Sequence, residues 1–280
     1  MRVNPQPSAE APLAEHQVEA AALSDAGTER GDNEDSCGIL VESGTCAVVA
    51  VADGVSSYEG GEVASRMAIE VMLRAYREEA PTLGAGQRLY RAFQQANIEI
   101  YDRAVAVPEL RGMATTLTAV ALERGGLTAV HVGDSRLYLV RGGKITQLTK
   151  DHTVAADKVR FGLLAREKAR THPDRSVLTR SVGRELIVSR DRLTQRLFHG
   201  DLLLLCSDGL HNVLADEEMA RMVAGRNAAE ACRALVDAAN ERGTPDNVTA
   251  AVARMVGPTA GAPRPGGLGS RLLRLLGRSG

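Results

Sequence analysis

Four aspartates stand at the borders of apolar runs of the kind that form buried strands. Asp53, Asp134 and Asp208 each follow such a run and precede a glycine or a serine, whereas Asp246 lies just before one. A carboxylate at a strand end has a fixed direction, so the four could meet in one anionic cluster. Like charges held this close stay ionised only when protons or cations compensate them, and all-oxygen ligands favour Mg²⁺ or Mn²⁺. Aspartate before glycine is also a common hairpin turn, and the repetition weakens that interpretation without reversing it.

Histidine and cysteine offer no competing constellation. The six histidines are scattered through the chain, whereas a zinc or iron binuclear site would need histidines interleaved with carboxylates. His131 lies three residues before Asp134, and we expect it to be a structural residue on a strand. The four cysteines form no Cys-x2-Cys pair, and none begins a Cys-x5-Arg loop, which excludes cysteine-based attack on a phosphate.

Length and composition indicate one globular domain. The chain has 280 residues, of which 44% are hydrophobic and 25% charged, and its formal net charge is −1. These values are ordinary for a soluble domain and indicate no strongly basic surface, so nucleic acid is a poor candidate partner. We find neither a signal pattern nor a run long enough to span a membrane, and therefore expect a cytoplasmic protein.

The elements that must position the carboxylates come in groups. Period-two patterns predict strands over 18–23, 37–41 and 46–52, and period-3.6 patterns then predict helices over 61–79 and 87–106. Strands joined by glycine turns follow over 114–122, 127–132, 136–140 and 144–148. Beyond 183 the patterns predict strands over 186–188, 192–198 and 202–206, helices over 216–224 (capped by Asp216) and 228–242, and a strand over 248–256.

Grouped strands and helices favour an α+β fold with antiparallel sheets over a doubly wound parallel sheet. The segment 151–183 is long for a connection between strands and has weak periodicity, so we expect it to be a functional flap with two helical pieces. Its two histidines, His152 and His172, are weak candidates for contact with a substrate.

Five short motifs, in order, carry a resemblance to a known family. They are Arg30 with Glu34-Asp35, then Val51-Ala52-Asp53-Gly54, Gly133-Asp134-Ser135-Arg136, Cys206-Ser207-Asp208-Gly209 and Asp246-Asn247-Val248-Thr249. With 178–183 between the third and the fourth, the set resembles the metal-dependent serine/threonine protein phosphatases of type 2C, in their bacterial form. The resemblance covers roughly 18–256. It implies a four-layer α-β-β-α sandwich, in which two antiparallel sheets packed face to face are flanked by helices.

The resemblance also implies a reaction and its metal ligands. The reaction is hydrolysis of phosphoserine and phosphothreonine by a metal-activated water, in opposition to a bacterial serine/threonine kinase. Asp53 would bridge two Mg²⁺ or Mn²⁺ ions, with the carbonyl of Gly54 and Glu34 completing the site of one ion, and Asp208 and Asp246 holding the other. Two cations suit this reaction because they neutralise the phosphate dianion and activate water near neutral pH.

Three further residues receive roles from the same resemblance. Asp134, together with Asp208, would serve a third and weaker metal site, as in bacterial members. Asp35 would lie behind the ligands and orient their waters. Arg30 would hold the substrate phosphate, for which the planar fork of a guanidinium is well suited. Ser135 and Arg136 are expected to support the fold by hydrogen bonding.

One position departs from the family pattern. Eukaryotic members carry a histidine, proposed as the general acid, after the Asp-Gly pair, and here that position is Val55, followed by Ser56-Ser57 in place of small glycines. Two alternatives to a protein phosphatase stay open. One is a catalytically idle member that binds phosphorylated proteins, and the other is a phosphatase for small phosphomonoesters or anti-sigma-type regulators.

The domain boundaries follow from composition. We expect a flexible leader over 1–16, a catalytic domain over 17–256 that includes the flap, and a Pro/Gly linker over 257–267. The tail 268–280 places leucines on one helical face and arginines on another, so it could touch a membrane or a partner, although a frayed, solvated tail is the simpler interpretation. The catalytic domain is expected to be a monomer.

Overall fold

The computed structural model describes residues 17–55, 60–123 and 125–256, which hold two five-stranded antiparallel sheets. The first sheet has the order β2-β3-β4-β5-β8, and its strands are β2 (Asp35–Ser43), β3 (Cys46–Asp53), β4 (Leu117–Glu123), β5 (Gly126–Val132) and β8 (Asp191–Arg196). The second has the order β1-β10-β9-β6-β7, and its strands are β1 (Gln17–Asp25), β10 (Val248–Val256), β9 (Leu202–Cys206), β6 (Arg136–Arg141) and β7 (Lys144–Gln147).

Strand β3 illustrates why these segments are apolar. Both of its faces are covered, so its sequence is hydrophobic from Cys46 until Asp53 ends the strand. Val48 packs toward the helices on one side, while Val49 and Val51 pack into the core between the two sheets. The β-branched valines favour the extended backbone as well as the packing.

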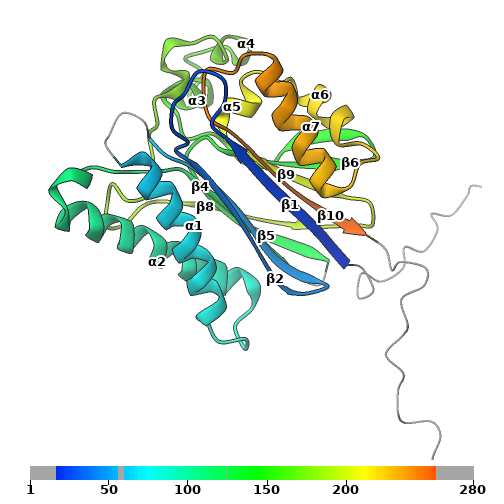
Figure 1. Cartoon of the computed structure of the whole chain (residues 1–280), viewed down its shortest axis with the longest axis horizontal. Helices are drawn as coiled ribbons and strands as arrows, with labels where there is room; N and C mark the ends of the chain where they lie inside the picture. Colours follow the sequence, from blue (N-terminus) through cyan, green and yellow to red (C-terminus); the bar gives the residue numbers. More distant parts are fainter. Residues whose placement is uncertain (1–16, 56–59, 124, 257–280) are drawn as a thin grey trace, which may run out of the picture.

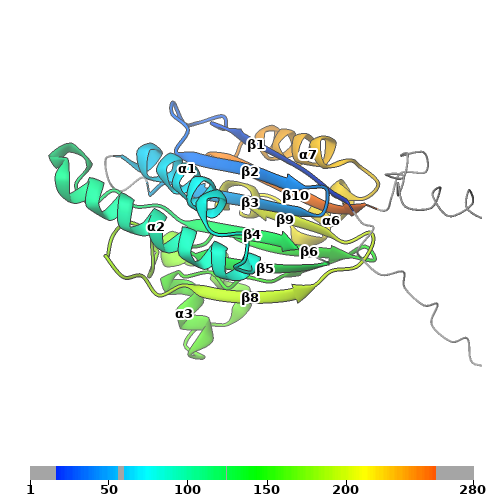
Figure 2. The same cartoon turned by 90° about the horizontal axis from the view of Figure 1, so that it is seen from below.

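Helices complete the four layers. α1 (Gly61–Glu78) and α2 (Ala85–Ala106) pack against the first sheet, and α6 (Asp216–Val223) and α7 (Ala228–Glu241) against the second. Figures 1 and 2 show the two helical pairs on opposite outer sides of the stacked sheets. Each helix turns an apolar stripe inward, as Ala64, Ala68 and Met72 do on α1 at a spacing of four residues. The predicted α-β-β-α sandwich is confirmed.

Shorter helices occupy the connections. The segment between β7 and β8, called the flap below (151–183), contains α3 (Val154–Arg160), α4 (Arg166–Ala169) and the 3-10 helix η3 (Pro173–Ser176). Another 3-10 turn, η2 (Pro108–Leu110), follows α2, and α5 (Asp208–His211) follows β9 directly. Figure 1 places α3, α4 and α5 at one end of the sandwich.

Two predictions about the elements are wrong. Residues 186–188 form no strand, because Leu186 and Ile187 are exposed and the carbonyls of Glu185 and Leu186 accept hydrogen bonds from the Asn97 side chain. Asp216 is the first residue of α6 and not its cap, which is Ala215 without a side-chain cap bond.

No helix among the described residues is long and apolar enough to cross a membrane. The predicted leader (1–16), linker (257–267) and tail (268–280), as well as Ser56 and Ser57, lie outside the described residues.

Candidate active site

Four aspartates from four separate segments line one pocket at an end of the sandwich. Asp53 is the last residue of β3, Asp134 lies between β5 and β6, Asp208 is the first residue of α5, and Asp246 lies just before β10. Asp53 ends a strand of the first sheet, Asp208 and Asp246 border strands of the second, and Asp134 lies between a strand of each, so the pocket lies where ends of both sheets meet. The same pocket is lined by Arg30, Gly54 and Val55, and by the flap residues Ser176, Val177 and Leu178.

None of the three Asp-Gly or Asp-Ser pairs is a hairpin turn. Asp53 leads from β3 toward α1, and Asp208 opens a short helix. Asp134 connects β5 to β6, which belong to different sheets. The turn interpretation that each pair allowed is therefore wrong, and the aspartates stand at points where the chain leaves one layer.

The backbone of Asp53 is fixed by two threonines that precede β4. Its N–H donates to Oγ1 of Thr116 at 2.9 Å, and its carbonyl accepts from Oγ1 of Thr115 and from the amide of Thr116, both at 2.8 Å. Thr116 Oγ1 also lies 2.7 Å from Oγ of Ser135, the residue after Asp134. Sequence reasoning missed both threonines, since nothing in their pattern distinguishes them from ordinary strand residues.

Asp35 lies behind the pocket, opposite Asp53 in the β2–β3 ladder. It is buried, and its Oδ2 accepts hydrogen bonds from Ser207 Oγ at 2.6 Å and Thr249 Oγ1 at 2.7 Å. The pKa of Asp35 is raised to about 7, chiefly by burial and to a smaller extent by the carboxylates of Asp208 and Asp246, against the opposing effect of the two hydroxyl donors. Asp35 thus joins both sheets from inside, and it is not among the residues that line the pocket.

Gly54 and Glu34 are adjacent through their backbones. The Gly54 amide donates to the Glu34 carbonyl at 3.0 Å. A Cβ on Gly54 would lie 2.4 Å from the carbonyl oxygen of Gly61, at the start of α1, so only glycine fits between β3 and that helix. The Glu34 carboxylate lies against Gly61 as well, because a Cβ there would come within 2.5 Å of Glu34 Oε1. Its backbone is held by Asn247, whose Oδ1 accepts from the Glu34 amide at 2.9 Å.

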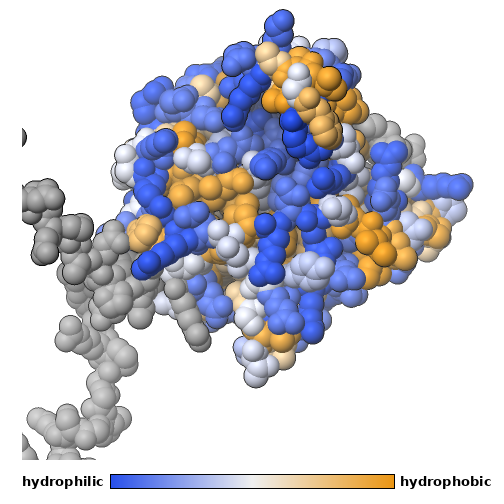
Figure 3. Space-filling model, turned by 180° about the vertical axis from the view of Figure 1, so that it is seen from behind, coloured by the Kyte–Doolittle hydropathy of each residue, from blue (hydrophilic) through white to orange (hydrophobic). Residues whose placement is uncertain are grey.

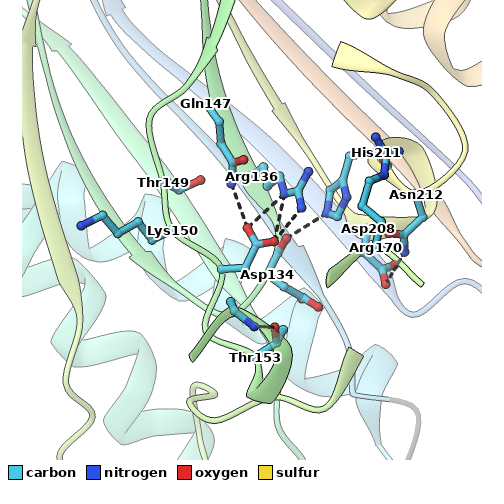
Figure 4. A network of polar contacts seen from close by, with 12 residues as sticks. Asp134, Arg136, Gln147, Thr149, Lys150, Thr153, Arg170, Asp208, His211 and Asn212 are labelled. Carbon is cyan, nitrogen blue, oxygen red and sulfur yellow. Dashed lines mark hydrogen bonds and ion pairs between the residues drawn. The ribbon is translucent and has the colours of Figure 1, made fainter. Parts of the chain in front are cut away.

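Asp134 is buried beside the root of the flap. Figure 4 shows it among Arg136, His211 and Asp208. His211 Nε2 donates to its carbonyl at 3.0 Å. Two residues further on, Arg136 forms a two-pronged ion pair with Asp151, the first residue of the flap, at 2.7 to 3.1 Å. The expected supporting role of Arg136 is thus an ion pair to the flap.

Asp208 and Asp246 approach each other through close backbone packing. A Cβ on Gly209 would lie 2.1 Å from the carbonyl oxygen of Asn247, so α5 can lie against the start of β10 only because Gly209 lacks a side chain. Asn212 Nδ2 donates to Asp208 Oδ2 at 3.1 Å. The glycines after Asp53 and Asp208 therefore serve close packing of the chain on itself.

Arg30 reaches the pocket from the loop between β1 and β2. Its Nη2 lies 3.1 Å from Asp246 Oδ1, and its Nε donates to the carbonyl of Pro245 at 3.4 Å. The guanidinium lies at the rim of the pocket, where it pairs with the carboxylate of Asp246 and is also partly exposed to solvent.

The carboxylates destabilise one another's ionised forms. Burial raises the pKa of Asp53 well above its ordinary value, and Asp35, Asp208, Asp134 and Asp246 each add to the rise. Burial, followed by the charge of Asp208, does the same to the pKa of Asp134. The pKa of Asp208 rises to about 6, mainly through burial and then through Asp246. Such a group of mutually repelling carboxylates is stabilised by multivalent cations.

Two observations describe how well these residues fit divalent metal ions. The pocket's acidic side chains offer only oxygen donors, the set that Mg²⁺ and Mn²⁺ prefer, and no histidine lines it. Across residues 17–55, 60–123 and 125–256, no three His, Cys, Asp or Glu side chains are already grouped closely enough to form a ligand set. The carboxylates line the walls, so backbone oxygens and waters would have to complete each ion's coordination, as is usual for Mg²⁺.

The histidines near the site are structural. His131 Nε2 lies 3.1 Å from the carbonyl of Lys150, which can only accept, so the ring proton is on Nε2 and Nδ1 accepts from the Thr118 hydroxyl at 2.8 Å. Burial lowers the pKa of His131 to about 4, which keeps the ring neutral. This confirms the expected role of His131. His172 Nδ1 accepts from the Asp174 amide at 3.0 Å within the flap.

Comparison with known proteins agrees with this geometry. The family model described as Protein phosphatase 2C matches residues 29–253. The serine/threonine phosphatase stp of Listeria monocytogenes is 34% identical over 236 residues, which cover 83% of this chain and 94% of that protein. The serine/threonine protein phosphatase PstP of Mycobacterium tuberculosis is 38% identical over 247 residues, which cover 88% of this chain and 46% of that protein.

Solved structures give the same result. The crystal structure of the Mycobacterium tuberculosis phosphatase PstP/Ppp superposes with a TM-score of 0.78 at 35% identity, and covers 86% of this chain and 99% of that one. The catalytic domain of PstP in complex with two manganese ions superposes with a TM-score of 0.76 at 34% identity, with the same coverage. The four-layer fold, the order of the motifs and these matches agree, and the chain belongs to the protein phosphatase 2C family.

Proposed function

We propose that this serine/threonine phosphatase hydrolyses phosphoserine and phosphothreonine of protein substrates in the pocket lined by Asp53, Asp134, Asp208 and Asp246. The observation that carries the proposal is the convergence of these carboxylates, from both sheets, on one pocket that also holds an arginine. Nucleophilic attack on a phosphate dianion requires that its charge be neutralised, and divalent cations bound by such a cluster do so.

The family and the manganese complex of a relative indicate dependence on divalent metal ions. We assign Asp53 to both of two ions, the Gly54 carbonyl and Glu34 to the first, and Asp208 and Asp246 to the second. When bound, the ions would supply Lewis-acid charge and an activated water for in-line attack. We further assign Asp134, with Asp208, to a third and weaker ion, and either Mg²⁺ or Mn²⁺ suits these oxygen donors.

The chain's own residues supply substrate binding and support. Arg30 is assigned to the substrate phosphate, and since it pairs with Asp246 at 3.1 Å, binding a phosphate there means sharing or exchanging that partner. Asp35 is assigned a supporting role behind the ligands, where Ser207 and Thr249 hold it in place. Val55 lines the pocket and cannot donate a proton, so its side chain cannot protonate the leaving group.

Protein substrates, rather than small phosphomonoesters, are favoured by the flap, which contributes to the pocket and carries exposed apolar side chains. Flap residues from Ser176 to Leu178 line the pocket, and Phe161 and Leu163 near the flap's tip are 67% and 77% exposed. Figure 3 shows hydrophobic side chains gathered at the top of the molecule, where Figure 1 places the flap. Such side chains suit contacts with a polypeptide on either side of the phosphorylated residue. The relatives are named serine/threonine phosphatases, an activity that reverses the action of a serine/threonine kinase, and we assign such a kinase as the opposing enzyme.

The test is hydrolysis of a phosphothreonine peptide by the purified full chain, with EDTA, MgCl₂ and MnCl₂ in parallel. We expect release of phosphate only with added metal, and faster release from the peptide than from free phosphothreonine. A folded protein that releases no phosphate with either metal would overturn the proposal and leave phosphoprotein binding without hydrolysis. Equal rates with peptide and free phosphothreonine would overturn the preference for proteins.

A further inference from the structure

The two ends of the flap are bound to each other at His152. The His152 amide donates to the carbonyl of Gly133 at 2.8 Å, and the His152 carbonyl accepts from the Thr179 amide at 2.8 Å. One residue further in, Thr153 and Leu178 form an isolated bridge. His152 thus connects the entering segment of the flap, its returning segment and the residue before Asp134.

The His152 side chain makes a second bond to the same glycine. It is 3% exposed, and its Nδ1 accepts from the Gly133 amide at 3.1 Å. Because Nδ1 accepts, the ring proton lies on Nε2, which faces Asp191 Oδ1 at 3.4 Å. Arg180, from the returning segment of the flap, donates from Nη1 to the same carboxylate oxygen at 3.1 Å. Its Nη1 is equally close to Nε2, but both nitrogens are donors and form no hydrogen bond with each other. The ring also lies against that of His131, with 4.8 Å between centroids and the ring planes tilted by 32°.

Gly133 cannot change its conformation or its residue type without disturbing the site. Its φ is +109°, and a Cβ there would lie 2.5 Å from the side chain of Thr116, which also binds the backbone of Asp53. His152 therefore binds both the amide and the carbonyl of the residue that sets the direction of Asp134. Without the Nδ1 acceptor a buried amide would be left unpaired, which commonly costs about 1–3 kcal/mol and favours a different backbone path.

We propose that His152 is a positioning residue for the Asp134 carboxylate, and that through it the root of the flap sets the affinity of the metal ion that Asp134 shares with Asp208. The inference rests on the proposed function, since it concerns an ion assigned there. Residues that orient metal ligands from behind typically change metal affinity about 10- to 100-fold when they are replaced.

Two substitutions distinguish the role of Nδ1 from that of Nε2. In His152→Asn the side-chain oxygen can take the place of Nδ1, because it is the same number of bonds from Cβ, so the bond from Gly133 is retained. In His152→Gln the terminal amide takes the place of Nε2, so the bond to Asp191 is retained and the acceptor for Gly133 is lost. His172→Gln is the matched control, because it removes the same kind of bond, from the Asp174 amide to Nδ1, elsewhere in the flap.

The measurement is calorimetric titration of MnCl₂ into the metal-free full chain without substrate, together with the Mn²⁺ dependence of peptide hydrolysis. For His152→Gln we expect the dissociation constant of the weakest Mn²⁺ to rise about tenfold or more, with the tighter sites changed less than about threefold. His152→Asn and His172→Gln should both remain within about threefold of the wild type. Wild-type affinity in His152→Gln, or an equal loss in His172→Gln or in His152→Asn, would overturn the inference.

A second measurement needs no variant and applies even where His152→Gln does not fold. Because coupling is reciprocal, filling the weakest site should slow amide hydrogen exchange at Gly133, His152 and Thr179 together. Unchanged exchange at these amides, with the ion bound, would contradict the inference. Failure of the proposed function can be told apart from failure of this inference, because in that case the wild type itself would lack metal-dependent hydrolysis.

Discussion

Replacing Asp208 with asparagine should stabilise the metal-free protein while it abolishes hydrolysis. Burial, with a contribution from Asp246, raises the pKa of Asp208 from an ordinary 3.8 to about 6. One pKa unit corresponds to about 1.4 kcal/mol, so the ionised form is disfavoured by up to ~3 kcal/mol. Because Asp208 is only partly buried, we take ~1–3 kcal/mol as the gain. Asparagine retains an oxygen that can accept from Asn212.

The sign of the pH dependence follows from the proton balance. Between pH 3.8 and about 6 the folded state holds more of a proton on Asp208 than the unfolded state does, so stability falls as the pH rises through this window. The penalty is complete above pH 6 and absent below 3.8. The gain from asparagine should therefore be full at pH 8 and approach zero near pH 4.

Thermal unfolding in EDTA, at pH 8 and near pH 4, is the assay. For a domain of this size 1 kcal/mol moves Tm by about 2–4 °C, so we expect a rise of roughly 2–12 °C at pH 8. Added Mn²⁺ should then stabilise the wild type more than the variant. Asp237→Asn, on the exposed side of α7, makes the same charge change and should leave Tm unaltered. A lower Tm for Asp208→Asn at pH 8 in EDTA, or a gain that does not depend on pH, would refute the reasoning.

Two further predictions concern the same pocket. Asp53→Asn should lower metal-dependent peptide hydrolysis by about 10²-fold or more, because it removes the ligand assigned to both ions; a folded variant with undiminished activity would show that the assignment is wrong. Gly209→Ala should destabilise the protein by ~1–3 kcal/mol, since the new methyl group would lie 2.1 Å from the Asn247 carbonyl oxygen. Gly84→Ala is the control, because a Cβ at Gly84 meets nothing within 4 Å and should leave the stability unchanged. Equal melting temperatures for the two variants would contradict this prediction.

The sequence predicts the fold well where its patterns are long. Strands such as β3 and helices such as α1 are apolar in a fixed period, so their existence and order are predictable, and so is the grouping that excludes a parallel sheet. The segment 186–188 shows the limit of this reasoning. Leu186 to Val188 is as apolar as a short strand, but the Asn97 side chain, 88 or more positions away, binds the backbone there. Short apolar runs do not reveal which partner their backbone will find.

The carboxylates of the candidate site can also be predicted from the sequence. Aspartates at strand ends indicate where charge can gather, and the ordered motifs indicate which aspartates belong together. The residues that hold these aspartates in place cannot be predicted from the sequence in this way. Thr116 serves the backbone of Asp53, and Ser207 serves the carboxylate of Asp35 172 positions away, through single hydroxyl groups whose neighbours in sequence carry no sign of the contact.

The flap's attachment has a consequence for how such enzymes diversify. Every backbone bond that ties its roots lies at 152–154, 177–179 or 182, whereas the exposed Phe161 and Leu163 lie well beyond them. The tip between 155 and 169 could therefore be exchanged for a segment of another length or polarity, while the anchoring residues and 170–176, which contact the site, stay in place. Substitutions in the tip can then change the substrate preference during evolution without changing the residues that bind metal and phosphate. A chimaera that carries a relative's flap tip on these roots should acquire the relative's peptide preference and keep its own metal requirement.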